Sequence, residues 1–370
     1  MSSKTKQGII AIVAAAMGLS GVLAFRADAV PRYSARYGQR CGLCHVNPSG
    51  AGMRTTYASQ QLVPEELAWG HGRDSLSLPS PQLSPNVTIG ADFRELYVGS
   101  TQRANNLDFF LMQGDLYLVF QLDPKTTLYF NRGMSNSYEL FGTAYVLPLT
   151  GYLKAGRFVP SYGWKFDDHT MYVRSELDLA PPLSSDVGIE IGLQPGPLDV
   201  QISMVNGSRG STLDTDNSLA QSLNAIFRHE LAGIGVGIGV TGYHQRGPRA
   251  ILDVSGGYGY LTWHGLSWLA EADFARTSPR PGPRTTALVT SHELSYAVRQ
   301  GLELFGTYDF YDPDRCVMSG AKSRWGGGVR VMPTPYLALD ASYRKANTVA
   351  GPAISGGDFD ETVLQLHLFY

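Results

Sequence analysis

This sequence has little cysteine, little charge of either sign and only one long apolar run. The 370 residues include three cysteines, and 17% are Asp, Glu, Lys or Arg with a formal net charge of −2. A chain so nearly neutral gives no reason to expect nucleic acid or an anionic membrane surface as a partner. The mean hydropathy of −0.11 is too polar for a bundle of transmembrane helices. No G-x-S-x-G, HExxH, Walker or usable GxGxxG motif occurs, which argues against a hydrolytic or phosphate-handling enzyme.

The single long apolar run lies at the start of the chain. Lys4 and Lys6 precede "GIIAIVAAAMGLSGVLAF", and Ala27-Asp28-Ala29 forms a small-x-small cleavage site. This order is typical of a secretory signal peptide, so we predict that residues 1–29 are removed on export. The alternative is an uncleaved N-terminal anchor helix, because the run is nearly long enough to span a bilayer.

From Val87 onward the apolar residues alternate with polar ones. In "GLELFGTYDFYD", Leu304 and Tyr308 fall on one face of a strand, and Glu303 and Asp309 fall on the other. The same period of two recurs in "YLALDASYRK" and "FLMQGDLYLVFQLD". Each segment therefore predicts a strand with one apolar and one polar face.

The connections between these strands predict a barrel. Short turns such as "LDPKTT", "WHGLSW" and "RQGLEL" alternate with longer polar segments such as "RTSPRPGPRT". Outer-membrane barrels have short periplasmic turns and longer external loops. Seven hairpins with a first strand near 87–98 and a last near 360–370 give about sixteen strands. We therefore predict an all-β, up-and-down transmembrane barrel over residues 86–370; a soluble β-sandwich is the alternative.

Aromatic residues at strand ends, such as Tyr97, Trp263 and Tyr336, suit a membrane-interface girdle, although Tyr and Trp favour strands in general. The last strand, "ETVLQLHLFY", has Leu364, Leu366 and Leu368 on one face and ends in an aromatic residue. This end resembles the terminal strand of bacterial outer-membrane proteins. The resemblance implies the outer membrane of a Gram-negative bacterium, with lipid around the barrel.

Residues 30–85 precede the barrel and contain the motif "CGLCH". C-x-x-C-H is the attachment site of c-type haem. We expect Cys41 and Cys44 to form thioethers to one covalently bound haem c, and His45 to be the proximal ligand of its iron. A zinc site would need further matched ligands, a redox dithiol would need a βαβ setting, and a disulfide would leave His45 unexplained.

The distal ligand of that iron is open from the sequence. His71 in "WGHGRD" and Met53 in "GAGMRT" are the nearby residues of the types that haem iron takes, and a ligand from the barrel is a third option. We expect His71, because the chain between it and His45 is long enough to reach the other haem face. Met53 follows His45 so closely that the chain would have to reverse sharply.

The haem segment is too short to enclose a cofactor by itself. It has few apolar residues, and a haem needs an apolar shell. We therefore expect residues 30–85 to form a plug on the periplasmic side of the barrel or within its lumen. A Pro- and Ser-rich linker, "LSLPSPQLSPN", ends this segment near Pro85.

The lead "RYSARYGQ", the CGLCH box and the barrel end together resemble the fused outer-membrane cytochrome–porins of iron-oxidising bacteria. The resemblance implies an electron-transfer protein rather than an enzyme in the usual sense, with an Fe(II)-oxidising role left open. It implies a relay between an extracellular donor or acceptor, such as Fe(II), and a periplasmic carrier such as a soluble c-type cytochrome. The segment "HVNPSGAGMRTTY" does not match the iron-oxidising members, which leaves the donor open.

Two other functions stay open beside electron transfer. One is a porin for small solutes whose haem segment gates or senses. The other is a sleeve for a separate multihaem cytochrome.

The longest connection is also a candidate site. It contains Asp167, Asp168, His169, Glu176 and Asp178, a set of side chains that can hold a transition metal ion. We expect instead a solvated external loop; inward folding that narrows the pore, as third loops of porins do, is a further alternative. Cys316 is left unpaired by the haem box, and we assign it no role.

Overall fold

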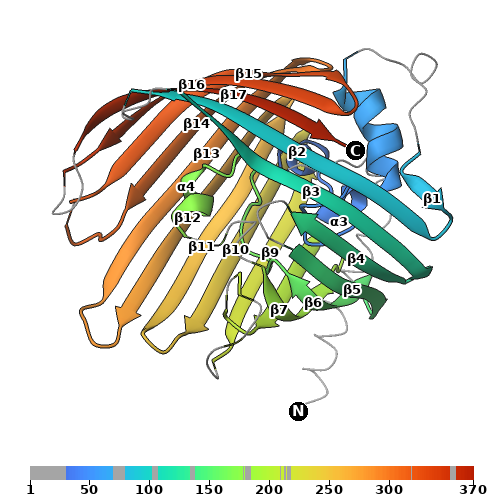
Figure 1. The fold of residues 1–370 in the computed structure, drawn as a ribbon, viewed down its shortest axis with the longest axis horizontal. Helices are drawn as coiled ribbons and strands as arrows, with labels where there is room; N and C mark the ends of the chain where they lie inside the picture. The colour runs from blue at the N-terminus through green and yellow to red at the C-terminus, as the bar shows by residue number, and fades with distance from the viewer. Residues whose placement is uncertain are drawn as a thin grey trace.

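The computed structural model describes residues 31–69, 80–101, 107–133, 138–177, 179, 185–208, 210–211, 214, 218–317, 319–350 and 356–370. The signal peptide and His71 lie outside these residues. The main body is a closed antiparallel barrel of sixteen strands, β2 to β17 (Figure 1). Its first eight strands are β2 Val87–Ser100, β3 Leu107–Asp123, β4 Thr126–Gly133, β5 Tyr138–Leu147, β6 Gly151–Phe158, β7 Asp186–Leu193, β8 Leu198–Val205 and β9 Ala220–Leu231. The others are β10 Ile234–Arg246, β11 Ala250–Trp263, β12 Leu266–Pro279, β13 Thr285–Arg299, β14 Leu302–Asp312, β15 Lys322–Thr334, β16 Leu337–Thr348 and β17 Gly357–Phe369.

The barrel is an up-and-down meander. Each strand pairs with the next in the chain, and β17 closes the ring on β2 through pairs such as Leu364 with Tyr97. The seven short turns predicted from the sequence all occur, and they lie together at what we call the turn end. One of them has Ala232 and Gly233 at φ 52° and 78°, which is typical of the tightest hairpin turns. The predicted fold class and strand number are confirmed.

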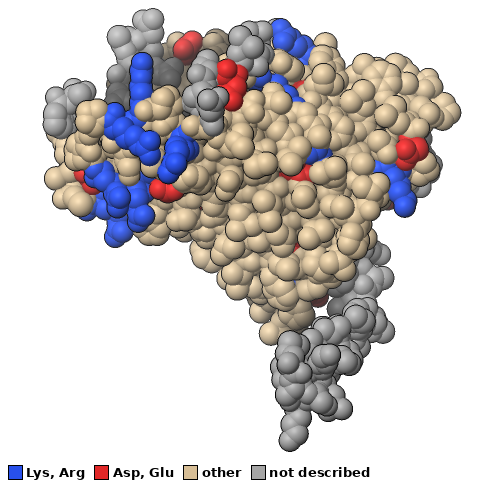
Figure 2. All heavy atoms as spheres, turned by 90° about the horizontal axis from the view of Figure 1, so that it is seen from below, with Lys and Arg blue, Asp and Glu red and all other residues tan. Residues whose placement is uncertain are grey.

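The barrel is apolar outside and polar inside. On β14, Leu304 and Tyr308 are 50% and 43% exposed, whereas Glu303 and Asp309 are buried in the interior. The alternation predicted for this strand therefore holds, with the apolar face turned outward. Figure 2 shows charged residues gathered toward two ends of the molecule and a band between them that is mostly free of charge. Such a band suits contact with lipid hydrocarbon.

The N-terminal segment lies at the turn end and inside the barrel. It forms α2 Pro31–Tyr37, α3 Cys41–Cys44 and a π-helical stretch, η1 Ala58–Leu67 (Figure 1). Within the lumen, the Arg32 guanidinium lies 3.3 Å from the Glu293 carboxylate of β13. At the turn end, Gln300 donates to the Glu65 carbonyl at 2.9 Å. A short strand, β1 Gln82–Ser84, then pairs with β2 just before the barrel begins.

The long connection between β6 and β7 folds into the lumen. Its described part, residues 159–177, is called the inward segment below and includes the one-turn helix α4 Tyr172–Ser175. Tyr162 donates to Asp273 at 2.7 Å, and the Tyr172 amide donates to Asp309 at 3.2 Å, both on the inner wall. The expectation of a solvated external loop is wrong for this segment, because the polar inner wall supplies partners that the sequence of the loop alone does not reveal.

No helix among the described residues is both long enough and apolar enough to cross a bilayer.

Candidate functional site in the barrel lumen

The C-x-x-C-H motif forms a single helical turn inside the lumen. α3 spans Cys41–Cys44, and His45 leaves it in extended conformation with φ −114° and ψ 141°. His45 Nδ1 lies 3.1 Å from the Gly52 carbonyl oxygen, which only accepts hydrogen bonds. Nδ1 therefore carries the proton, and in the neutral ring Nε2 carries the lone pair. That is the tautomer a metal-ligating histidine adopts when its other nitrogen is fixed by a backbone carbonyl.

The loop after the motif is fixed by a buried charge on the wall. Lys154 of β6 donates to Asn47 Oδ1 at 3.2 Å and to Ser49 Oγ at 2.9 Å. Its ammonium also lies 2.7 Å from the Glu190 carboxylate of β7, and both side chains are fully buried. Gly50 has φ +84°, and a Cβ there would lie 3.2 Å from Cys41 Sγ, so the loop needs a glycine at this point.

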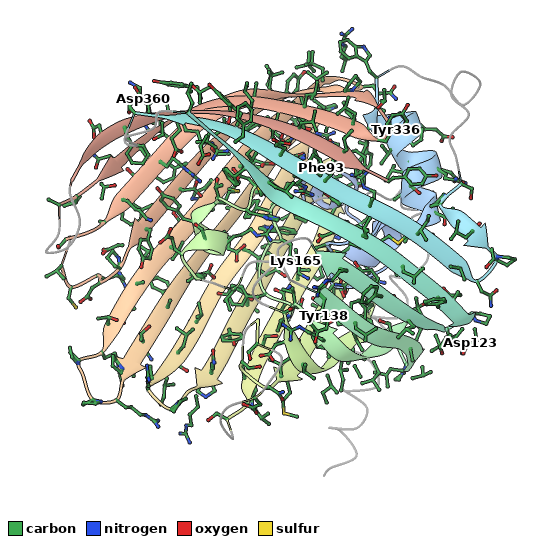
Figure 3. The ribbon with its side chains drawn as sticks, in the orientation of Figure 1. Phe93, Asp123, Tyr138, Lys165, Tyr336 and Asp360 are labelled. Atoms are coloured by element: carbon green, nitrogen blue, oxygen red, sulfur yellow. The ribbon has the colours of Figure 1, made fainter. Side chains whose placement is uncertain are left out.

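A cavity of about 170 Å³ lies between this loop and the inward segment. On the first side it is lined by Cys41, His45 and Met53, and on the second by Lys165 and His169. Lys165 donates to the Gly50 carbonyl at 3.2 Å, which ties the two sides together. Figure 3 shows Lys165 in the interior, between Asp123 and Tyr336 at the turn end and Asp360 at the other end.

The residues of the motif fit a covalent haem in part. Cys41 and His45 line the cavity, and neither Cys41 nor Cys44 forms a disulfide. Cys44, however, is buried against Ala58 and Leu62 of η1 and does not line the cavity. A thioether at Cys44 therefore requires its side chain to turn toward the cavity or η1 to shift. The residue types present are those that a c-type haem needs, but Cys44 does not reach the cavity in this structure.

Of the residues predicted as the distal ligand, the structure describes Met53 alone. His71 lies outside the described residues. Met53 lines the cavity, but a Cβ at Gly90 would lie 3.3 Å from both its Cγ and its Cε, so the sulfur between them rests against β2.

His169 also lines the cavity, and no hydrogen-bond partner for it is found in the described part of the chain. Burial, with Arg174 nearby, lowers the pKa of His169 well below its usual range, so its imidazole is neutral. From the sequence, His169 belongs to a loop. The inward fold of that loop places His169 on the same cavity as Cys41 and His45 of the motif.

The acidic set of the long connection does not gather into a metal site. Asp167 lies 2.9 Å from Arg32, Asp168 lies 2.5 Å from Arg344, and Glu176 lies 2.8 Å from Lys322. Burial alone would raise the pKa of Asp167, but Arg32 and Arg94 hold it below its usual range. Among the described residues, which exclude Asp178, no three His, Cys, Asp or Glu side chains lie together as metal ligands. Cys316 is exposed between β14 and β15, far from the motif in the chain.

The similarity of this chain to known proteins is one of fold. No protein-family model matches the chain, and no curated protein matches it. Among solved structures, it is similar to the anion-selective porin of Comamonas acidovorans, with a TM-score of 0.57 and 10% identity over 77% of this chain and 99% of that one. It is also similar to OmpT of Vibrio cholerae, with a TM-score of 0.58 and 9% identity over 78% of this chain and 99% of that one. A third similar structure is OprB of Pseudomonas putida, with a TM-score of 0.57 and 8% identity over 77% of this chain and 94% of that one. The chain thus has the fold of a porin-like outer-membrane β-barrel, with an N-terminal segment in its lumen.

Proposed function

We propose that this chain lies in the outer membrane of a Gram-negative bacterium and passes small polar solutes through a lumen that its own N-terminal segment narrows. The observation that supports this most is the polar interior. Buried charged side chains such as Glu303, Asp309 and Arg324 line the inner wall, while apolar side chains face outward. A wall of this kind solvates a polar solute and excludes lipid.

Two parts of the chain would set the width of the passage. The N-terminal segment and the inward segment meet through the ion pair of Arg32 with Asp167, at 2.9 Å. Arg32 also lies 3.6 Å from Glu303 on β14, so one side chain links the plug, the inward segment and the wall. A movement of the plug would therefore shift the inward segment as well. The plug is thus suited to gate the passage or to sense a ligand.

The test is conductance in planar bilayers. The full mature chain is expected to give a small, steady conductance, and R32A is expected to raise it by loosening the junction of the plug with the inward segment. R249Q, at an exposed position between β10 and β11, is the control and is expected to leave the conductance unchanged. Absence of any conductance in both the parent chain and R32A would contradict solute passage.

A second function is favoured by the position of Cys41 and His45 beside the lumen cavity. We propose that Cys41 and Cys44 would hold one haem c and that His45 and His169 would bind its iron. His169 is preferred to Met53, whose side chain rests against β2, and it takes the role first expected for His71. When bound, such a group supplies one-electron transfer. The chain would then relay electrons between an extracellular donor or acceptor, such as Fe(II), and a periplasmic c-type cytochrome.

The plug limits how that relay works. One haem near the turn end does not span a hydrocarbon core of about 30 Å by itself, so partners would have to approach from both ends. The same plug argues against a sleeve for a separate multihaem protein, because residues 31–69 and 159–177 already occupy part of the lumen.

Purified chain separates the two functions. A covalent haem absorption that survives acid–acetone extraction, and that is lost in C41A and in C44A, is the expected result for the second function. Reduction of that haem by Fe(II) then tests the donor. Conductance without any covalent haem would support solute passage and contradict electron transfer.

A further inference from the structure

Three cations line the lumen cavity with no carboxylate of the described residues in ion-pair contact: Arg174 is buried, and Arg54 and Lys165 are half-buried. Arg54, Lys165 and Arg174 all line it, and in the described chain no carboxylate forms an ion pair with any of them. Their contacts are with neutral groups. Lys165 donates to the Gly50 carbonyl, Arg174 donates to the Phe166 carbonyl, and the Arg54 guanidinium lies 3.6 Å from the centre of the Phe369 ring.

Several nearby carboxylates are engaged by other cations, whereas Glu139 and Asp115, which also line the cavity, accept hydrogen bonds from the Val159 amide and the Gln113 amide. Asp167 pairs with Arg32, and Asp92 lies 3.3 Å from Arg94 and 3.0 Å from His367. Glu190 pairs with Lys154. Overall the cavity is lined by seven Lys and Arg side chains and five Asp and Glu side chains. The lining itself thus has more cations than carboxylates, while Arg32 and Arg228 pair with Glu293 and Asp199 just outside it.

Unpaired buried charge is costly unless something compensates it. Burial lowers the pKa of all three groups, to about 8 for Lys165 and about 10 for Arg174. An anion in the cavity would remove that cost, and guanidinium groups are well shaped to bind carboxylate, sulfate or phosphate oxygens in pairs.

We propose that Arg54, Lys165 and Arg174 form a binding site for an oxyanion in the lumen, between the C-x-x-C-H loop and the inward segment. The three come from different parts of the chain: Arg54 from the N-terminal segment, and Lys165 and Arg174 from the inward segment. The oxyanion has two sources with the same chemistry. It is either a free dianion that enters the lumen, or the carboxylates of a haem attached to Cys41.

The experiment is a sulfate titration by calorimetry, on the full mature chain in detergent at pH 7. It uses two backgrounds, the parent chain and C41A/C44A, which cannot attach a haem. R54Q, K165Q and R174Q are made in the second background, with R249Q as the matched control at an exposed position. A charge-assisted hydrogen bond contributes roughly tenfold or more in affinity, so each of the three variants is expected to weaken sulfate binding at least about tenfold. R249Q is expected to stay within about twofold.

The two backgrounds identify the source of the anion. Equal sulfate binding in both supports a free anion as the ligand. Binding in C41A/C44A but not in the parent chain supports haem carboxylates that already fill the site. No saturable binding in C41A/C44A, or binding that R54Q, K165Q and R174Q leave unchanged, overturns the proposal.

Since C41A/C44A needs no haem, the site can exist in a protein in which the electron relay fails. Any variant that loses its β-sheet circular dichroism is replaced by K165R or R174K, which keep the charge. These are expected to lose less affinity than the Gln variants, and equal losses count against the site.

Discussion

At the scale of single residues, the chemistry of the lumen depends on which groups hold a proton. The Gly52 carbonyl fixes the tautomer of His45, and burial keeps His169 neutral. Burial lowers the pKa of Lys165 to about 8, so its charge changes just above neutral pH. These three side chains face the same cavity.

We predict that sulfate affinity falls as pH rises above about 8. Burial and the nearby Lys154 together lower the pKa of Lys165 to about 8, against Glu190, Glu139 and Cys41, which raise it. The protonated form binds an anion, so affinity is full below that pH and declines above it; sulfate keeps its charge throughout. Calorimetry from pH 6.5 to 9.5 measures the change. K165Q should bind weakly and without this slope, and a slope that persists in K165Q would assign it to another group.

His169→Ala tests the proposed distal ligand. If His169 binds the haem iron, its loss should convert a six-coordinate, low-spin haem spectrum to a high-spin one, and added imidazole should restore it. Optical spectra of the purified chain measure this directly. M53A and H71A serve as controls and should keep the low-spin spectrum; a low-spin spectrum in H169A would exclude His169.

At the scale of elements, the inward segment and the loop that follows the C-x-x-C-H motif are both held by charged side chains of the wall. Arg344 of β16 donates to Thr170 at 2.8 Å and pairs with Asp168. Lys154 of β6 holds the loop after the motif through its hydrogen bonds to Asn47 and Ser49. The inward segment also buries apolar side chains such as Trp164, Phe166 and Met171 against the wall. Ion pairs depend on direction and distance more than apolar contacts do, so we expect these pairs to fix the exact position of each segment.

We predict that Arg344→Ala releases the inward segment and raises the single-channel conductance. The Asp168 carboxylate, which is 24% exposed, would lose its ion-pair partner, and a partly buried charge left unsatisfied costs about 1–3 kcal/mol. Lys345, the next residue, is exposed and so faces away from the lumen, and K345A is the control. Unchanged conductance in R344A would show that other contacts hold the segment.

Glu190→Gln should destabilise the folded chain by about 3–5 kcal/mol, because it leaves the buried Lys154 ammonium without a carboxylate. Urea unfolding in detergent micelles gives the free energy. The control is E176Q, since the Glu176–Lys322 pair is partly exposed and should cost less than about 1 kcal/mol. An equal loss of unfolding free energy in E190Q and E176Q would show that burial does not make the Lys154–Glu190 pair more stabilising than the partly exposed pair.

At the scale of the whole molecule, the barrel has an apolar outer face, and we propose that lipid covers it. Val240 lies midway along β10 and is 55% exposed, whereas Leu231 is 68% exposed beside a turn. Both side chains face outward, but at different depths of the expected hydrocarbon band.

V240R should lower the free energy of unfolding in lipid vesicles by about 2–4 kcal/mol, and L231R by about 1 kcal/mol or less. A charge at the centre of the bilayer has no water to solvate it, whereas one at the interface does. Urea titration in vesicles of defined lipid measures both. The same loss for the two variants would be inconsistent with a lipid-facing band.

The sequence by itself determined the barrel. Period-two alternation, as in Leu304 and Glu303, and the turn signals are local properties, and a closed barrel follows when every strand pairs with its neighbour. The C-x-x-C-H motif is local too, since its chemistry depends on the spacing within five residues.

Only the tertiary structure decided what faces the motif. The inward position of Asp167 and His169 depends on partners such as Arg32 and Arg344, which lie far away in the chain and become neighbours only when the barrel closes. The same holds for Arg54, Lys165 and Arg174, whose lack of acidic partners is a property of the assembled lumen. Sequence patterns report which side of a strand is buried; they do not report which distant side chain meets it, because that is fixed by pairing register and loop closure.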